Sequence, residues 1–369
     1  MATLTQYSEF ETLLDEIAPG ETISREQACR LIRCPAELLP DSLRAARAER
    51  ARHKPAVITY SRKVFLPLTN LCTDYCGYCA FRRDPREKGA HTMTPDEILA
   101  LVAQAERLGC TEALFSLGDK PEARFPEMKD LLRRLGYKST LHYLEAMCEL
   151  VLRHSRVLPH ANPGLMSASW INRLAAVSPS LGLMLETTSR GLLEAGGAHE
   201  HAPDKIPARR LQVLSEAGKQ QVPFTTGILI GIGETLDDRV DALFAMRDWP
   251  EPSEDDLLRT VAVARLILGG KMNVQAPPNL SAPNFSRLLD AGINDWGGIS
   301  PLTPDFINPE RPWPHLQKLQ QQTERAGFTL KQRLPVYPEF IPAALVRGGA
   351  MAERLRQAAD LGGLARSAA

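Results

Sequence analysis

The sequence has no net charge and no long apolar run. Its 369 residues include 44 Lys and Arg against 44 Asp and Glu. This balance argues against a protein that holds nucleic acid or a membrane surface by bulk electrostatics. No stretch approaches the roughly 20 apolar residues that a membrane-spanning helix needs. Residues 1–11 contain acidic side chains and no apolar segment, so we expect no signal peptide there.

Cysteine is scarce as well. There are seven, and an odd number in a long chain argues against a disulfide framework. We therefore expect a cytoplasmic protein, whose thiols stay reduced and can bind metal. No exact repeat and no low-complexity tract stands out. The hydrophobic content of 44% and the charged content of 24% are those of a globular protein with a sizeable core.

Short apolar runs alternate with helical periodicity through most of the chain. Residues 1–55 predict helices, and Ser24 and Gln27 are placed to form a capping box. A second box, Thr94 with Glu97, predicts a helix over 95–108. Predicted strands are 64–69, 113–117, 157–160, 181–187, 224–230, 272–276 and 293–299. Short apolar strands separated by helices indicate an α/β fold with a covered parallel sheet, and closing it into a TIM-type (β/α) barrel suits this length.

Only seven strands can be placed, whereas a closed (β/α)8 barrel has eight. Helices are expected at about 236–246 and 253–268, and the residues between them leave no room for a strand. We therefore expect the barrel to lack one strand between Met246 and Ser253, so that it is split, closes with seven strands, or belongs to a truncated form. The predicted division is an N-terminal helical extension (1–55), a barrel (56–312) and a C-terminal helical extension with a tail (313–369).

Three cysteines follow the first predicted barrel strand within one short loop. They are Cys72, Cys76 and Cys79, and the next cysteine is Cys110. Cysteine thiolates hold iron–sulfur clusters, and three ligands on a four-iron cluster leave one iron open. Such an iron can chelate the amino and carboxylate groups of S-adenosylmethionine, and an electron from the cluster can then cleave its C–S bond. Active sites of these barrels lie at this end of the strands.

Zinc is the alternative for the same cysteines. A structural zinc site needs four ligands, usually as two close pairs. His53 or His91 can complete a set of four, but no second pair is present. Packing cysteines are a further alternative, although Asp74 and Gly77 between them make a poor buried face. The spacing therefore favours the cluster.

The C-x3-C-x2-C spacing, with an aromatic residue before the last cysteine, resembles the radical S-adenosylmethionine superfamily. Longer strings resemble the small subunit of FO synthase (CofG type), which makes the deazaflavin 7,8-didemethyl-8-hydroxy-5-deazariboflavin (FO). The strings are 60–81 (YSRKVFLPLTNLCTDYCGYCAF), 115–122 (FSLGDKPE), 273–279 (NVQAPPN) and 295–305 (DWGGISPLTPD). The resemblance covers roughly residues 56–314 and extends into the tail.

The resemblance implies a reaction. A 5′-deoxyadenosyl radical takes hydrogen from an adduct of the 4-hydroxybenzyl group of tyrosine with 5-amino-6-(ribitylamino)uracil. Ring closure and loss of ammonia then give FO, with 5′-deoxyadenosine and methionine as co-products. It also implies a [4Fe-4S] cluster, S-adenosylmethionine, a reducing electron donor, and a CofH-type partner radical enzyme that makes the adduct. A nucleic-acid or membrane partner is not expected.

The resemblance also suggests which residues contact S-adenosylmethionine. Tyr78 belongs to the cysteine motif, and Gly118-Asp119 with Glu122 closes the second predicted strand, where the methionine ammonium is held. The alternative is an ordinary polar turn. Glu186 and Arg190 are expected at the ribose and carboxylate, with a surface pair as the alternative.

Gly231 lies in a glycine-rich stretch that lacks the features of a phosphate loop. Its glycines are expected to let the adenine approach a strand end. His199-Glu-His201 invites a metal interpretation, but the neighbouring glycines and proline favour an ordinary mobile loop.

Four polar residues near the last two predicted strands are hypothetical substrate contacts. Asn273, Gln275, Asn279 and Asp295 offer groups that suit a uracil edge or ribityl hydroxyls, and structural turns explain several of them equally well. Three hypotheses about function follow. They are an active FO-forming enzyme, a truncated cluster-binding homologue with impaired or no catalysis, and a radical enzyme acting on another substrate.

Overall fold

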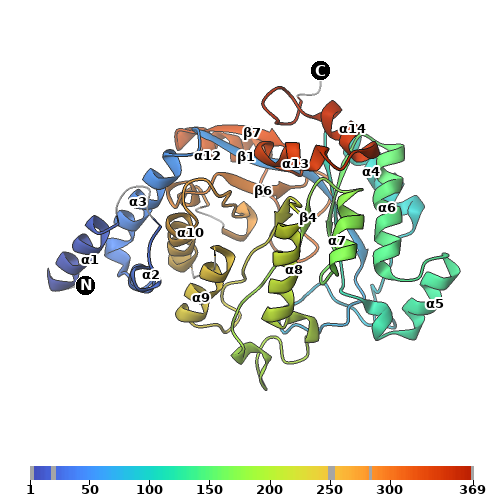
Figure 1. Ribbon diagram of the computed structural model, residues 1–369, viewed down its shortest axis with the longest axis horizontal. Helices are drawn as coiled ribbons and strands as arrows, with labels where there is room; N and C mark the ends of the chain where they lie inside the picture. The colour runs from blue at the N-terminus through green and yellow to red at the C-terminus, as the bar shows by residue number, and fades with distance from the viewer. Residues whose placement is uncertain (1–3, 18–21, 248–253, 282–284, 367–369) are drawn as a thin grey trace.

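The computed structural model describes residues 4–17, 22–247, 254–281 and 285–366. Its centre is a parallel sheet surrounded by helices (Figure 1). The strands are β1 (Val57–Thr69), β2 (Glu112–Leu117), β3 (Leu158–Asn162), β4 (Leu181–Gly182), β5 (Phe224–Thr225), β6 (Asp295–Ile299) and β7 (Thr329–Arg333). Their order is β5-β4-β3-β2-β1-β6, and β7 also pairs with β1. The predicted covered parallel sheet is confirmed, in the form of an open half-barrel.

Helices on the outer face follow the strands in alternation. They are α4 (Pro95–Arg107), α5 (Pro126–Arg134), α6 (Thr140–His154), α7 (Ala168–Ala175), α8 (Pro207–Lys219), α9 (Leu236–Arg247), α10 (Glu254–Leu268), α11 (Arg287–Asp290) and α12 (Leu316–Arg325). The capping box at the start of α4 is present, with Thr94 accepting a hydrogen bond from the backbone N–H of Glu97 and the Glu97 side chain accepting one from Thr94. Apolar residues of α4, such as Ile98 and Val102, are buried against the outward side chains of β1.

The N-terminal helices are α1 (Leu4–Asp15), α2 (Arg25–Leu31) and α3 (Leu39–Ala51), and the Ser24–Gln27 capping box opens α2 as predicted. These helices lie together beside α9 and α10 (Figure 1). Leu39 and Leu43 share a core with Val263 and Ile267 of α10. The extension therefore packs directly on the barrel.

The set of strands differs from the prediction in two places. The strand expected at 272–276 was wrong, because only Gln275 forms an isolated bridge, to Asp295. Two prolines follow directly, and proline cannot donate to a strand ladder. The strand β7 was missed because its sequence, TLKQR, is polar and only its last residue, Arg333, is buried. It lies within the segment expected to be helical, which also contains α13 (Ile341–Leu345) and α14 (Gly349–Ala358) at the same end of the molecule (Figure 1).

The barrel is open between β5 and β6. Within the described parts of 226–294, no segment joins the sheet as a strand. The expected missing strand between Met246 and Ser253 concerns residues 248–253, which lie outside the described residues. The division into 1–55, 56–312 and 313–369 remains a prediction. No helix in the described part of the chain is long and apolar enough to cross a bilayer.

Candidate functional site

The cysteine loop, residues 70–93, runs from the end of β1 to the start of α4. Cys72, Cys76 and Cys79 all lie in it, each half-buried and each a free thiol. Asn70 fixes the base of the loop, because its side chain donates to the carbonyl of Gly89 at 2.8 Å and accepts from the backbone N–H of His91 at 2.8 Å. The loop thus presents three sulfur atoms at the carboxyl end of the sheet, where barrel active sites are built.

The turn after β2 supports Cys72 directly. The backbone N–H of Asp119 donates to the Cys72 sulfur at 3.2 Å. The carbonyl of Asp119 accepts from the backbone N–H of Thr73 at 3.0 Å. A β-carbon at Gly118 would lie 1.9 Å from the carbonyl oxygen of Leu71, so only glycine permits this approach.

The three thiols suit an iron–sulfur cluster. Burial raises the pKa of Cys72 to about 12 and that of Cys76 to about 11. Thiolates are the metal-binding form, so bound iron has to displace these protons. A donor set of three cysteines in one loop supplies all the protein ligands that an open-cornered four-iron cluster requires.

A pocket of buried acids lies next to Cys72. Asp74, Asp119 and Asp204 present carboxylate oxygens within 4.8 Å of one another. Asp119 accepts from the backbone N–H of Leu165 through Oδ2, while its buried Oδ1 has no hydrogen bond in the described structure. Burial raises the pKa of Asp119 to about 6. Lys120 partly neutralises the group, lying 2.8 Å from Asp204 and 3.4 Å from Asp119.

Tyr78 and Glu186 lie in one cluster with His199, Lys205 and Arg210. The Tyr78 hydroxyl lies 3.0 Å from His199 Nε2. Glu186 forms an ion pair with Lys205 and lies 3.6 Å from Arg210. The Lys205 ammonium helps to keep the pKa of Glu186 below its usual value, despite the burial that opposes it. Glu186 also has a φ of 75°, an uncommon conformation for a residue other than glycine.

The remaining predicted cofactor residues have different surroundings. Glu122 accepts from the backbone N–H of Thr140 at 3.0 Å and so satisfies the start of α6. Arg190 is exposed before the short turn η3 (Gly191–Leu193). Gly231, at φ 80°, donates its N–H to Glu234 at 2.8 Å. The loop containing His199 is no ordinary surface loop, because this side chain is only 1% exposed.

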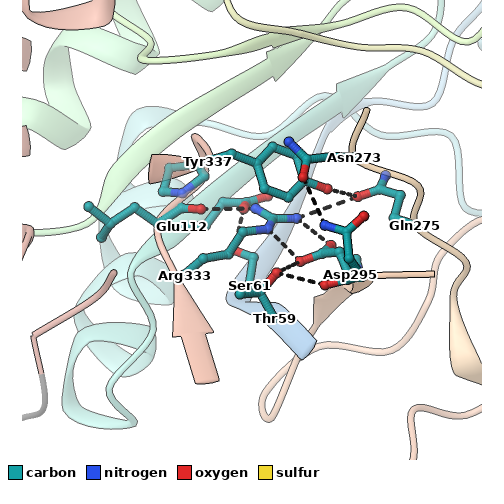
Figure 2. A network of polar contacts seen from close by, with 12 residues as sticks. Thr59, Ser61, Glu112, Asn273, Gln275, Asp295, Arg333 and Tyr337 are labelled. Atoms are coloured by element: carbon teal, nitrogen blue, oxygen red, sulfur yellow. Dashed lines mark hydrogen bonds and ion pairs between the residues drawn. The ribbon is translucent and has the colours of Figure 1, made fainter. Parts of the chain in front are cut away.

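Three of the four predicted substrate contacts lie far from the cysteine loop. Asp295 begins β6 and faces Thr59 near the start of β1, whereas the cysteine loop follows Thr69. Ten strand residues separate the two levels, which corresponds to about 33 Å. Figure 2 shows Arg333 between Asp295 and Gln275, with distances of 2.7 Å from Arg333 Nε to Asp295 Oδ2 and 3.4 Å from Arg333 Nη2 to Gln275 Oε1.

Asn273 lies beside this network (Figure 2), and it hydrogen-bonds with Asn294 and Glu339, both at 2.8 Å. The structure therefore places Asn273, Gln275 and Asp295 in a polar plug at the amino end of the barrel. The physical reason is that Asp295 is the first residue of β6 and Gln275 pairs with it as an isolated bridge, so both lie at the edge where the amino ends of the parallel strands meet. Asn279 is separate, donating to Asp305 and to the carbonyl of Arg311, both at 3.0 Å.

Sequence reasoning missed the charged partners of the site. Lys120, Lys205 and Arg210 were not singled out, and neither were Asp74 and Asp204 as a cluster. Asp74 lies between two of the predicted cluster ligands and Lys120 follows Asp119, so their positions in the sequence could have indicated them. Lys205 reaches Glu186 through a tertiary contact that no local pattern announces.

A cavity of about 820 Å³ lies beside β5, between α8, α9 and the C-terminal segment. Leu211 of α8, Phe224 of β5, Met246 of α9 and Phe340 line it. Phe340 belongs to the C-terminal segment at the amino end of the barrel. The cavity is therefore remote from the cysteines.

Comparisons with known proteins agree with this site. The family model of the radical SAM superfamily matches residues 66–246. FO synthase of Mycobacterium tuberculosis (strain CDC 1551 / Oshkosh) is 48% identical over 327 residues, which is 79% of this chain and 38% of that protein. The 7,8-didemethyl-8-hydroxy-5-deazariboflavin synthase of Methanopyrus kandleri is 44% identical over 311 residues, covering 77% of this chain and 93% of that protein.

This chain therefore spans about two fifths of the mycobacterial relative and nearly all of the methanogen one. The alignment with the mycobacterial relative is 327 positions long, which is more than 79% of the 369 residues of this chain. The alignment therefore contains gaps, where the relative has residues that this chain lacks.

Two solved structures share the fold. HydG, a maturase of the [FeFe]-hydrogenase, has a TM-score of 0.70 at 15% identity, covering 96% of this chain and 90% of its own. Methylornithine synthase (PylB) has a TM-score of 0.64 at 18% identity, covering 86% and 97%. The fold, the cysteine loop and the sequence relatives together place this chain in the radical SAM superfamily and, within it, in the FO synthase family.

Proposed function

We propose that this protein is a radical S-adenosylmethionine lyase that forms FO from the tyrosine-derived adduct 5-amino-5-(4-hydroxybenzyl)-6-(D-ribitylimino)-5,6-dihydrouracil. Ammonia, 5′-deoxyadenosine and methionine are the other products. The observation that carries the proposal is the gathering of three free cysteines in one loop at the carboxyl end of the sheet. The match to nearly the whole length of the methanogen synthase supports the choice of reaction.

Cys72, Cys76 and Cys79 would hold the [4Fe-4S] cluster. With S-adenosylmethionine bound, the cluster supplies a 5′-deoxyadenosyl radical. Asp119 suits the methionine ammonium, because its buried Oδ1 accepts no hydrogen bond among the described residues and its charge is offset only by the Lys120 ammonium 3.4 Å away. A carboxylate acceptor and a cationic donor form a strong, charge-assisted hydrogen bond.

Tyr78, Gly118, Glu186, Arg190 and Gly231 remain proposed cofactor contacts. Glu186 and Tyr78 are the better supported, since they meet in one cluster beside Cys76. Glu122 is the weakest of the predicted set, because both of its carboxylate oxygens are engaged at the start of α6.

We further propose that a CofH-type radical enzyme supplies the adduct and that a reducing protein or small donor supplies electrons. We expect both enzymes in the cytoplasm.

A second candidate function is cluster binding without turnover of the adduct. Its motivation is the opening between β5 and β6, where substrate would meet an incomplete wall. Anaerobic reconstitution with iron and sulfide, followed by assay with the partner's product, separates the two candidates. Equal amounts of FO and 5′-deoxyadenosine support the proposed lyase, whereas 5′-deoxyadenosine without FO supports the second candidate.

A further inference from the structure

The inward face of the barrel carries a histidine that the site described above does not use. Inward and outward side chains alternate along β1 and β2, and the outward ones, such as Val64 and Phe115, pack under the helices. Leu114 of β2 pairs with Phe65 of β1 and with His160 of β3. His160 therefore points inward, three residues below Leu117, about 10 Å beneath the end of β2.

Solvent reaches the inward face as far down as Leu114 of β2, and on β3 as far down as Asn162. Outward Ala113 and Phe115 are fully buried, whereas inward Leu114 and Ser116 are only half-buried. Asn162, above His160 on β3, is also half-buried. The inward residues His160 and Glu112 are only 7% and 6% exposed. His160 thus lies at the floor of the open part of the barrel, on the side that faces the cysteine loop.

A hydrogen-bond chain fixes the tautomer of His160. Ser180 donates its only hydroxyl hydrogen to the carbonyl oxygen of Pro335 at 2.7 Å, since a carbonyl can only accept. The Ser180 oxygen must then accept from His160 Nδ1, which lies 2.7 Å away. A neutral imidazole with its proton on Nδ1 has a bare lone pair on Nε2.

Nothing in the described structure occupies that lone pair. His160 Nε2 makes no hydrogen bond with any described residue, and it is not among the fully buried unpaired atoms. A β-carbon on Gly182 would lie 3.0 Å from Nε2 and so would crowd it. Glycine at this position leaves the imidazole nitrogen accessible from the interior.

The surroundings keep the imidazole neutral. Burial lowers the pKa of His160 below its usual value. Glu112 of β2 opposes this effect, while Arg333 of β7 and Lys63 of β1 reinforce it. The group is therefore a free base near neutral pH, which is the state that accepts a proton.

We propose that His160 is the catalytic base and acid of the ammonia-releasing step, an inference that rests on the proposed function. Nε2 takes a proton from the carbon that was the benzylic carbon of tyrosine. The C–H electron pair becomes the new C=C bond to the carbon that bears the amino group. The C–N bond breaks with its pair on nitrogen, and Nε2 returns the proton to that nitrogen, which leaves as ammonia. The step is redox-neutral and restores His160.

The first test compares His160→Asn with the wild type, both carrying the reconstituted cluster. Asparagine can still donate to Ser180 but has no group at the position of Nε2. We expect FO formation to fall by about 100-fold or more, while cluster content and 5′-deoxyadenosine formation stay within about twofold. His154→Asn is the matched control, because His154 is an exposed histidine at the end of α6. An unchanged ratio of FO to 5′-deoxyadenosine, or equal loss of both products with the cluster intact, overturns the proposal.

The second test does not depend on turnover. Nitrogen-15 NMR of the His160 ring in the holoenzyme reports which nitrogen carries the proton. We expect a protonated Nδ1 and a bare Nε2 in the wild type, and a mixture of tautomers in Ser180→Ala with a smaller loss of FO. Ser178→Ala is the matched control, since it removes a nearby buried hydroxyl that faces Cys148 instead. A wild-type proton on Nε2 contradicts the assignment, even if His160→Asn does not fold.

The products formed by the wild type distinguish failure of the His160 assignment from failure of the proposed function. If the wild type makes 5′-deoxyadenosine but no FO from the adduct, the proposed function itself has failed. If the wild type makes both and the His160→Asn ratio does not change, only the assignment of His160 has failed.

Discussion

The two ends of the barrel differ in how completely their buried polar groups are paired. At the amino end, Arg333 and Asp295 bind each other through two hydrogen bonds of 2.7 and 2.9 Å, and neither is more than 5% exposed. At the carboxyl end, the buried Oδ1 of Asp119 accepts no hydrogen bond from any described residue and has the Lys120 ammonium 3.4 Å away, and three thiols have no disulfide partner. A buried ion pair makes the fold depend on both partners, whereas buried polar groups without a hydrogen-bond partner are candidates for ligand contacts.

The contrast also explains why polar residues alone did not locate the substrate site. Asn273, Gln275 and Asp295 have the chemistry to bind a uracil, yet their hydrogen bonds are used within the polar plug (Figure 2).

Replacing Cys76 with alanine should abolish radical formation. Loss of a residue that only hydrogen-bonds to a metal ligand already costs about 10–100-fold in metal affinity or activity. Loss of a ligand itself should therefore cost at least about 100-fold. Iron content and 5′-deoxyadenosine formation are the measurements. Cys148→Ala is the control, because Cys148 is buried in the outer core. Retention of full iron by Cys76→Ala would contradict the cluster assignment.

Replacing Arg333 with methionine should destabilise the fold. The change leaves Asp295 buried without its partner, which typically costs about 3–5 kcal/mol. Urea unfolding measures the loss in free energy of unfolding. Lys331→Met on the same strand is exposed and should change that free energy by less than about 0.5 kcal/mol. Equal effects of the two substitutions would show that the ion pair has no special role.

Replacing Asp119 with asparagine should weaken the binding of S-adenosylmethionine. A hydrogen bond to a charged group contributes about 1.5–3 kcal/mol, which corresponds to about 10–100-fold in the KM for the cofactor. Cluster content should not change. Asp130→Asn, at an exposed site on α5, serves as the control. An unaltered KM would remove Asp119 from the cofactor site.

Replacing Glu122 with alanine should lower the free energy of unfolding by about 0.5–2 kcal/mol, as expected for a lost helix cap. The KM for S-adenosylmethionine should stay the same. Thermal unfolding and steady-state kinetics measure the two quantities, with the exposed Glu127→Ala on α5 for comparison. A raised KM with unchanged stability would return Glu122 to the cofactor site.

The sequence was sufficient for features that are encoded locally. Both capping boxes are governed by residues three positions apart, and the cysteine triplet is a spacing within one loop. Parallel strands covered on their outer face also produce a clear apolar pattern, as in β2 and β3.

Local sequence patterns could not predict features that depend on contacts between residues far apart in the sequence. β7 is polar and becomes a strand only because β1 is long enough to pair with it beside β2. His199 meets Tyr78 across 121 positions of sequence. The role of Asp295 follows from its place as the first residue of β6, which required the exact start of the strand.

We propose that Cys72, Cys76 and Cys79 hold a four-iron cluster with one iron open to S-adenosylmethionine. Electron paramagnetic resonance of the reduced, reconstituted protein, recorded before and after adding S-adenosylmethionine, tests it most directly. We predict the signal of a reduced [4Fe-4S] cluster that changes when the cofactor is added. A protein that binds one zinc and no iron, or a cluster signal that does not respond to the cofactor, would contradict the claim.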